Sequence, residues 1–334
     1  EAEEEITWES SNMSLATVSA DGVVTMSNSA DIGATVTITA KAGGKSATCN
    51  ITVPGEIYNL YLAGIQVTSR NKDNLAELVA ETSEASMEQF STGKMEISFD
   101  GTTLRLKDAV IDTGDKAAQG MTLGINGMTL IVEGDCTVKS KNYNGLKVAN
   151  NATITGDGSL RLEGKHSGIM FDSPSEVYIT TLTLDHVKVE ALGSSLSIDG
   201  GLNPDYSNML QVNHSDLTAT GQIFFANGDI LLDESYYVEP KKPYFRYNGD
   251  FMDGEQVATG LKIRPFDKGD VNQDGKVDAT DLVLTISYTK GQNPAKFLFV
   301  AADVNGDSHV DQADVKLIAD IILDQYIPLT PIDN

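Results

Sequence analysis

Near the C-terminal end of the chain, oxygen-bearing side chains recur at intervals suited to binding a hard metal ion. They occupy positions 1, 3, 5, 9 and 12 of a loop, and Gly275 occupies position 6, where a calcium loop turns sharply. Ca²⁺ takes about six to eight oxygen ligands, and the main-chain carbonyl at position 7 completes such a set. The sequence therefore predicts a calcium site formed by Asp270, Asn272, Asp274, the carbonyl of Lys276, Asp278 and Asp281.

The same pattern begins again 33 residues further along the chain. Each loop leads into an apolar segment that we expect to be helical, and the two apolar faces can pack on each other. Position 6 of the second loop is Ser308, which places a non-glycine residue in a left-handed turn, so we expect weaker calcium binding there. The second predicted site consists of Asp303, Asn305, Asp307, the carbonyl of His309, Asp311 and Asp314.

The duplicated loop and helix of residues 267–327 resemble the type I dockerin, a module that docks secreted polysaccharide-degrading proteins onto cohesin domains. Aspartate stands at position 12 of both loops and we expect no helix to enter either loop, features that favour a dockerin over an ordinary EF-hand. The resemblance implies two bound Ca²⁺ ions and a partner, which is a cohesin-like protein or another domain of this chain. It implies partner contacts at loop positions 10 and 11, which are Ala279, Thr280, Gln312 and Ala313.

Composition limits the other possible partners. The chain has 334 residues with 24 Lys+Arg and 48 Asp+Glu, so its formal charge is 24 − 48 = −24. A surface this acidic repels nucleic-acid phosphates and anionic membranes, and no segment reaches the ~20 apolar residues that span a bilayer. Cys49 and Cys136 are too few for a disulfide framework. We expect both thiols to be inert and Cys49 to be buried.

Residues 1–55 contain short alternating strands separated by turns at Asp21-Gly22 and Gly43-Gly44, which predicts a small β-sandwich. The run ITWESSNMSLATVSADGVVTM, beginning at Ile6, resembles the bacterial Ig-like domain, type 2, of surface and secreted proteins. The resemblance covers only the later strands of that family. We therefore expect its first strands to precede Glu1, which begins a mature or trimmed fragment, and expect the partial sandwich to expose an edge.

Residues 57–265 form the largest region. One amphipathic helix is expected within residues 73–90, since Leu75, Leu78 and Val79 fall at helical spacing. Beyond it, short alternating strands follow turns, and four strand starts are separated by 23, 27 and 26 residues. These starts are Leu146, Ile169, Leu196 and Gln222, preceded by Asn144-Gly145, Ser167-Gly168, Ser194-Ser195 and Thr220-Gly221.

A period of this length is typical of a solenoid, in which each coil stacks on the next. We predict a right-handed parallel β-helix, with Asn and Gly supplying positive φ at its corners; a β-sandwich is the alternative. The fold class is then mainly β: a partial Ig-like sandwich, a central solenoid and a small α-helical calcium module. The run NGLKVANNATITGDGSLRLEG, from Asn144, resembles bacterial secreted domains described as carbohydrate-binding and built like the pectin-lyase β-helix.

Catalytic residues are not predicted for the solenoid. Polysaccharide-cleaving β-helices need clustered carboxylates with a basic residue, or paired aspartates on successive coils, and no such run occurs. One charged group is interpreted as outward-facing and solvated: Arg161, Glu163, Lys165, His166, Asp172, Asp185 and His186. Four tyrosines either stack on sugar rings or help to cover the last coil, and we favour the cover: Tyr236, Tyr237, Tyr244 and Tyr247.

The sequence as a whole predicts a secreted or cell-surface bacterial protein without catalysis. Its solenoid would contact carbohydrate, and its dockerin would bind Ca²⁺ and a cohesin-like partner, in polysaccharide capture or catabolism. Two alternatives remain open at this point. One is a β-helical glycoside hydrolase or polysaccharide lyase with an attached dockerin, and the other is an adhesin whose dockerin packs within the same chain.

Overall fold

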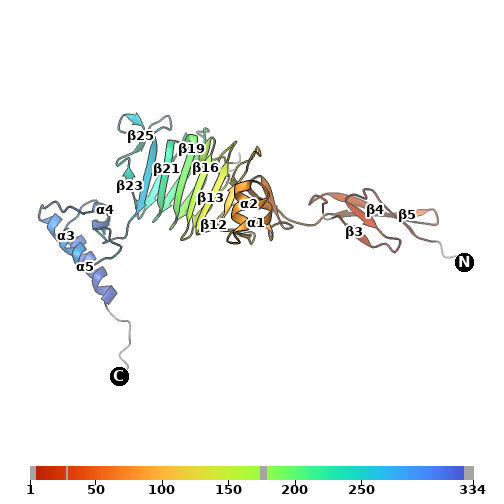
Figure 1. Ribbon diagram of the computed structural model, residues 1–334, viewed down its shortest axis with the longest axis horizontal. Coiled ribbons are helices and arrows are strands. Elements are labelled where there is room, and N and C mark those ends of the chain that lie inside the picture. Colours follow the sequence, from red (N-terminus) through yellow and green to blue (C-terminus); the bar gives the residue numbers. More distant parts are fainter. Residues whose placement is uncertain (1–4, 28, 174–178, 327–334) are drawn as a thin grey trace, which may run out of the picture.

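The protein is described by a computed structural model, in which residues 5–27, 29–173 and 179–326 are placed. It is mainly β, with an N-terminal Ig-like region, a central β-solenoid and a C-terminal helical region (Figure 1). This is the fold class that the sequence predicts. Among the placed residues, no helix has the length and apolar character needed to cross a membrane.

The N-terminal region has two small antiparallel sheets. Its core contains Ala16, Val36 and Ile38, against which Trp8 packs. The predicted burial of Cys49 is wrong: this thiol is exposed, because it lies on an edge strand whose two faces are almost entirely open to solvent. The sheets are β1 (Thr7–Ser10), β4 (Thr35–Ala42) and β5 (Lys45–Thr52), and β2 (Ala16–Val18) with β3 (Val24–Met26).

The solenoid has three faces made of parallel strands, and apolar side chains from all three fill one continuous core. Two long strands bend across two faces: β19 (Lys188–Asp199) and β21 (Asp216–Phe224). Their first halves continue one face, formed by β10 (Val110–Asp112), β13 (Asp135–Ser140) and β16 (Ser159–Gly164). Their second halves continue another, formed by β11 (Met121–Leu123), β14 (Leu146–Val148) and β17 (Ser167–Phe171).

The third face holds β9 (Thr103–Lys107), β12 (Met128–Glu133), β15 (Ala152–Thr155), β18 (Ile179–Asp185), β20 (Ser207–Asn213) and β22 (Gly228–Asp233). The predicted stacking of coils is confirmed by strand register. Leu146 pairs with Ile169, and Leu196 pairs with Gln222, all in parallel ladders. Ile169 pairs with Ile198, two residues beyond the expected Leu196, because Leu196 pairs with Ser167 in that ladder.

The prediction that corner glycines supply positive φ is wrong for Gly145 and Gly168. Neither has a positive φ. A Cβ on Gly168 would lie 2.5 Å from the Leu192 nitrogen, and one on Gly145 would lie 2.8 Å from the Glu163 nitrogen. Glycine is needed here because neighbouring coils approach so closely that a side chain does not fit.

Antiparallel strands and helices cover the N-terminal end of the solenoid. The strands are β6 (Ile57–Leu62), β7 (Ile65–Thr68) and β8 (Glu96–Phe99). The single helix expected within residues 73–90 is instead two, α1 (Leu75–Ala80) and α2 (Glu84–Ser91). The break arises because the Ser83 hydroxyl accepts a hydrogen bond from the Ser86 nitrogen and so caps a new helix.

The C-terminal end of the solenoid is covered by antiparallel strands and aromatic side chains. Strand β27 (Gly260–Pro265) pairs with β21 on one side and with β23 (Ser235–Glu239) on the other. A small sheet lies beyond them, formed by β24 (Tyr244–Phe245), β25 (Phe251–Asp253) and β26 (Gln256–Val257). Phe245 lies between Phe225 and Phe251, at ring-centroid distances of 5.4 and 5.0 Å.

The described part of the C-terminal region has three helices: α3 (Ala279–Thr289), α4 (Phe299–Ala302) and α5 (Gln312–Tyr326). A small core contains Val271, Ala302 and Ile318. The expectation that no helix enters either loop is wrong for the second loop. The single turn α4 leads directly into it, because Leu298 is fixed by a hydrogen bond from its nitrogen to the Val271 carbonyl oxygen.

Candidate calcium loops and solenoid surfaces

The first predicted calcium loop is folded around two of its own carboxylates. Asp270 accepts hydrogen bonds from the nitrogens of Asp274 and Gly275, at 3.1 and 2.9 Å. Asp281 is fully buried and accepts from the nitrogens of Val271, Asn272 and Asp278, at 2.8, 3.0 and 2.9 Å. Positions 1 and 12 are thereby drawn to the same side of the loop, as calcium coordination requires.

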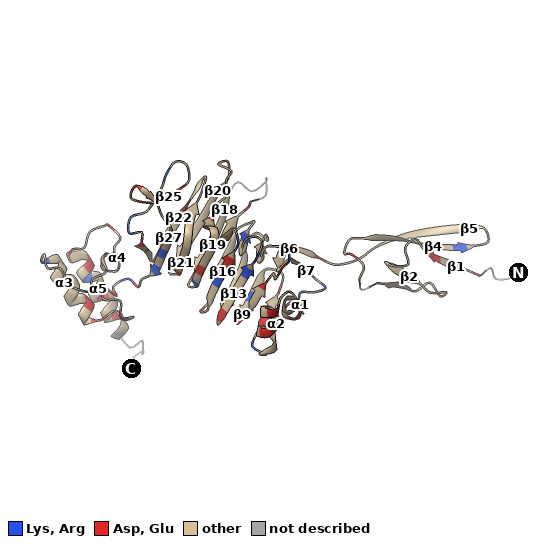
Figure 2. Ribbon diagram, turned by 45° about the horizontal axis from the view of Figure 1, so that its top comes forward, with Lys and Arg blue, Asp and Glu red and all other residues tan. Residues whose placement is uncertain are grey.

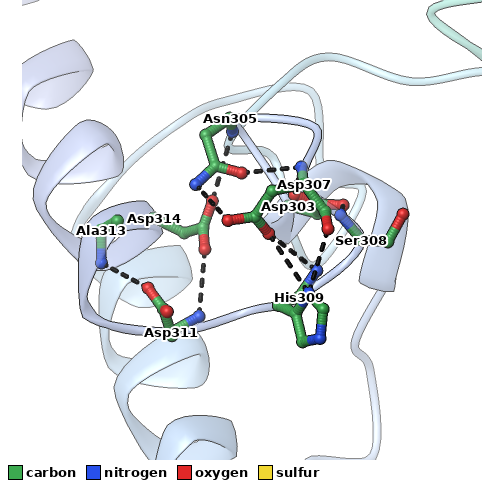
Figure 3. Close-up of polar contacts among 8 residues, drawn as sticks. All are labelled: Asp303, Asn305, Asp307, Ser308, His309, Asp311, Ala313 and Asp314. Carbon is green, nitrogen blue, oxygen red and sulfur yellow. Dashed lines mark hydrogen bonds and ion pairs between the residues drawn. The ribbon is translucent and has the colours of Figure 1, made fainter.

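The second loop repeats this arrangement (Figure 3). Asp303 accepts from the nitrogens of Asp307 and Ser308, at 3.1 and 2.9 Å. Asp314 is also fully buried and accepts from the nitrogens of Asn305 and Asp311, at 3.2 and 3.0 Å. The sequence repeat is therefore also a structural repeat, with corresponding carboxylates in corresponding roles.

The electrostatics of the first loop suit a cation. Burial raises the pKa of Asp270, and the nearby Asp281 and Asp274 charges add to the effect, against the opposing hydrogen bonds from Gly275 and Asp274. The Asn272 Oδ1 atom is buried and accepts no hydrogen bond. A divalent cation would satisfy this oxygen and offset the crowded carboxylates, so the residues present fit Ca²⁺.

Carboxylates alone do not complete either site. Within the placed part of the chain, no group of three or more His, Cys, Asp or Glu side chains is gathered closely enough to hold a metal. Each loop would also need its asparagine oxygen and its position-7 carbonyl, from Lys276 or His309. These are oxygen ligands of the kinds that calcium loops use.

The structure removes the asymmetry behind the prediction of a weaker second site. Each loop has two residues with positive φ, at positions 4 and 6. In the second loop these are Gly306 and Ser308, at +74° and +66°. In the first loop they are Gln273 and Gly275, at +59° and +84°. Each loop therefore carries one non-glycine residue in the left-handed region.

The four predicted partner-binding residues, Ala279, Thr280, Gln312 and Ala313, are all exposed, at the starts of α3 and α5. The carboxylates of Asp278 and Asp311 accept hydrogen bonds from the nitrogens of Thr280 and Ala313, at 2.6 and 2.7 Å, and so fix the first turns. The hydrogen bond from Thr280 holds the pKa of Asp278 below its usual value.

The charged residues singled out on the solenoid largely satisfy one another. Arg161 forms an ion pair with Glu190 on the neighbouring coil and approaches Glu163 to 3.5 Å, while Lys139 lies 3.4 Å from Glu163. Figure 2 shows basic and acidic segments interspersed over these strands. The group is a ladder of partly exposed ion pairs, which agrees with the interpretation of outward-facing side chains.

Four others of that group lie apart from the ladder. Lys165 is exposed, and the rings of His166 and Tyr143 meet edge to face, with centroids 6.2 Å apart. His186 lies 3.0 Å from the Asp185 carboxylate and stacks on His214 at a centroid distance of 4.8 Å.

The four tyrosines do not share one environment. Tyr237 packs against Phe251, and burial raises its pKa far above the usual value. Tyr236 accepts a hydrogen bond from Gln273 of the first calcium loop, at 3.0 Å. Tyr244 and Tyr247 are 48% and 97% exposed, so they have the most open rings of these four tyrosines.

Comparisons with known proteins identify the two ends of the chain. Residues 268–323 match the Dockerin type I domain family, and residues 1–51 match the Bacterial Ig-like domain (group 2) family. Comparison with curated proteins and with solved structures gave no match. Dockerin type I domains bind calcium and cohesin partners, and both domain types are typical of extracellular proteins. The pectin-lyase-like resemblance of the solenoid stays a prediction.

Proposed function

We propose that this chain is a non-catalytic, secreted or cell-surface protein that links carbohydrate to a cohesin-like partner. Its solenoid binds carbohydrate, and its dockerin region binds two Ca²⁺ ions and the partner, in polysaccharide capture or catabolism. The observation that carries the proposal is the matched pair of loops, in which Asp270 and Asp281 have the same hydrogen-bond roles as Asp303 and Asp314.

An intermolecular partner is favoured over packing within the chain. The helical region meets the solenoid through the Tyr236–Gln273 hydrogen bond and through Lys268, which lies 3.6 Å from Glu234. These contacts leave the starts of α3 and α5 exposed. Val283 and Leu323, on the same two helices, are each 60% exposed and add apolar surface for a partner to cover.

The partner half of the proposal is tested with a purified type I cohesin domain. We expect the chain to be retained by immobilised cohesin in millimolar CaCl₂ and released by EDTA. The double variant Thr280→Asp/Ala313→Asp, which places charges at the exposed helix starts, should lose binding. Lys290→Asp, at the exposed residue just after the C-terminal end of α3, is the matched control. Retention that survives EDTA would contradict a calcium-dependent dockerin.

The carbohydrate half is tested on a panel of soluble and insoluble plant and bacterial polysaccharides. We expect the chain to bind at least one of them without releasing reducing sugar. Released sugar would replace this proposal with a β-helical hydrolase or lyase. No binding to any glycan would remove carbohydrate from the function while leaving cohesin binding in place.

A further inference from the structure

A hollow of about 310 Å³ opens on the solenoid where β17 and β19 end. Met170 pairs with Asp199 in the parallel ladder between these strands, so two successive coils contribute to it. Asp172 and Asp199 both line the hollow, and the turn after β19 forms another wall. Pockets for small molecules begin at roughly 300 Å³, so the space suits one or two sugar rings.

Buried hydrogen bonds hold the walls in place. Asn208 is 3% exposed and donates from Nδ2 to the Gly200 carbonyl oxygen, at 2.7 Å. Its Oδ1 accepts from the Ser173 hydroxyl, at 3.0 Å. The Asp199 carboxylate accepts from the Gly201 nitrogen, also at 3.0 Å. One asparagine therefore joins the two walls, and the Asp199 carboxylate is fixed before any ligand arrives.

The lining combines acceptors with apolar surface. The two carboxylates can accept several hydrogen bonds from vicinal hydroxyl groups. Leu202, at the rim, is 79% exposed, and Tyr206 contributes to the same lining. A pyranose ring has hydroxyl groups along its edge and C–H bonds on its faces. The carboxylates of the hollow match the hydroxyl groups, and its apolar surface matches the C–H bonds.

The charge of the hollow selects among sugars. None of the described lining residues is Lys, Arg or His. Lys147, beside the hollow, is already 2.5 Å from the Asp172 carboxylate. Burial raises the pKa of Asp199, and the charge of Asp172 adds to this effect, against the opposing hydrogen bond from Gly201. A ligand with carboxylate or sulfate groups would add further negative charge and be repelled.

A metal ion is the other ligand that two carboxylates suggest. The described residues offer no group of three or more His, Cys, Asp or Glu side chains that could hold one. The exposed Leu202 side chain has no oxygen to offer an ion, whereas it can contact the C–H face of a sugar ring.

We infer that this hollow, between Asp172 and Asp199, is where the solenoid binds a neutral sugar unit, one without carboxylate or sulfate groups. The inference rests on the proposed function, which names carbohydrate but neither its site nor its class. It also locates the site away from the tyrosines of residues 236–247.

The test uses the full chain in CaCl₂ and calorimetric titration with xylohexaose, cellohexaose, mannohexaose and hexagalacturonate. We expect at least one neutral hexasaccharide to bind and hexagalacturonate not to bind. Asp199→Asn should weaken binding about tenfold, because it removes a charge-assisted hydrogen bond. Leu202→Ser should weaken it about threefold. Asp205→Asn, in the same turn but outside the hollow, should bind as the wild type does.

Each outcome decides the matter. Weakened binding in both variants with unchanged thermal unfolding supports the site. Wild-type affinity for the neutral sugar in both variants overturns the site but leaves carbohydrate binding by the chain intact. Tighter binding of hexagalacturonate overturns the sugar class. No binding of any neutral hexasaccharide overturns this inference, and the proposed function falls with it only if the polysaccharide panel is also negative.

Discussion

Each calcium loop bends through two residues with positive φ, one of which is not glycine. A non-glycine residue in the left-handed region costs about 1–2 kcal/mol in strain. Glycine removes this strain but loses more conformational entropy on folding, so only part of the energy is regained. We predict that Ser308→Gly and Gln273→Gly each raise the calcium affinity of their own loop by a few fold. Calcium titration followed by calorimetry measures both sites.

The two substitutions control for each other. If Ser308 alone weakened its loop, Ser308→Gly would tighten one site and Gln273→Gly would change nothing. Equal gains would support the structural symmetry of the loops. A loss of affinity in either variant would show that the left-handed side chain makes a favourable contact that outweighs its strain.

Asp199 makes a pH-dependent contribution to stability. Burial raises its folded-state pKa above the unfolded value of about 3.9, so the folded state holds this proton more tightly. Stability from this group is present below the unfolded pKa and lost as pH rises through the folded pKa. We predict that Asp199→Asn unfolds at higher denaturant concentration than the wild type at pH 7.

The difference should shrink as the pH falls below the folded-state pKa of Asp199, where the wild-type carboxyl is also protonated. Urea unfolding of the solenoid at several pH values measures it, with the exposed Asp205→Asn as control. An Asp199→Asn variant that is less stable than the wild type at neutral pH would show that the carboxylate, when charged, is stabilised by its surroundings. If Asp199→Asn is instead more stable than the wild type at neutral pH, the chain keeps this carboxylate at a cost in stability, as expected for a residue that binds a ligand.

The grouping of the loop residues was predictable because it is encoded by spacing, and the structure folds the first loop around Asp270 and Asp281; their role as Ca²⁺ ligands stays a prediction. Asp270 through Asp281 lie within one short segment, and the ligand pattern groups them without tertiary information. Asp172 and Asp199 were not paired by sequence, and the expectation that no aspartates pair on successive coils is wrong for these two. They are 27 residues apart, and only the register of β17 on β19 brings them to one hollow.

The coils of the solenoid are held at a spacing that some positions can meet only with glycine. Gly168 is buried between coils, and a Cβ there would meet the main chain of Ala191 and Leu192. We predict that Gly168→Ala lowers the free energy of unfolding of the solenoid by about 2–3 kcal/mol, because backbone must shift to make room. Urea denaturation followed by circular dichroism measures this value.

Ser194→Ala is the matched control, because this exposed residue lies at the corresponding corner of the next coil. It should change stability by less than about 0.5 kcal/mol. If Gly168→Ala were equally mild, the coils would have room to separate at this corner. The close approach would then not be the reason for glycine.

Elements were predictable where one periodicity dominates. Alternation and turn spacing located the stacked strands, because every coil repeats the same alternation of buried and exposed side chains. The helix within residues 73–90 was predicted as one because Leu75 and Val79 do lie buried on one face. The structure breaks it at Ser83, where a hydroxyl competes for the main chain, and Met87 beyond the break is 43% exposed.

At the scale of the whole molecule, the negative charge has different roles in different regions. From Asp267 onward the chain has 12 Asp, no Glu and 5 Lys, so this region contributes 5 − 12 = −7 of the total −24. Most of that charge lies in the two loops, where two Ca²⁺ ions would bring a charge of +4 to offset it. The remainder, −17, belongs to the Ig-like region and the solenoid, and a surface of this charge would repel nucleic-acid phosphates.

Among the described residues, few polar contacts join the three regions. On the N-terminal side, Arg70 donates to the carbonyl oxygens of Ala30 and Pro54, at 2.5 and 3.4 Å. On the C-terminal side, His214 lies 3.7 Å from Asp267, in addition to the Tyr236–Gln273 hydrogen bond. Exposed ion pairs contribute about 0–1 kcal/mol each, too little to make the regions unfold as one unit.

We therefore predict separate unfolding transitions in scanning calorimetry of the whole chain, only one of which depends on calcium. A site filled at 100 times its Kd stabilises the fold it belongs to by about 2.7 kcal/mol, so CaCl₂ should move the dockerin transition upward and leave the solenoid transition in place. With EDTA, limited proteolysis should remove the segment from Asp267 onward while the solenoid persists. If CaCl₂ instead raised every transition together, the Tyr236–Gln273 contact and its neighbours would have to couple the dockerin to the solenoid far more strongly than exposed polar contacts do. Tyr236→Phe would then be expected to uncouple them.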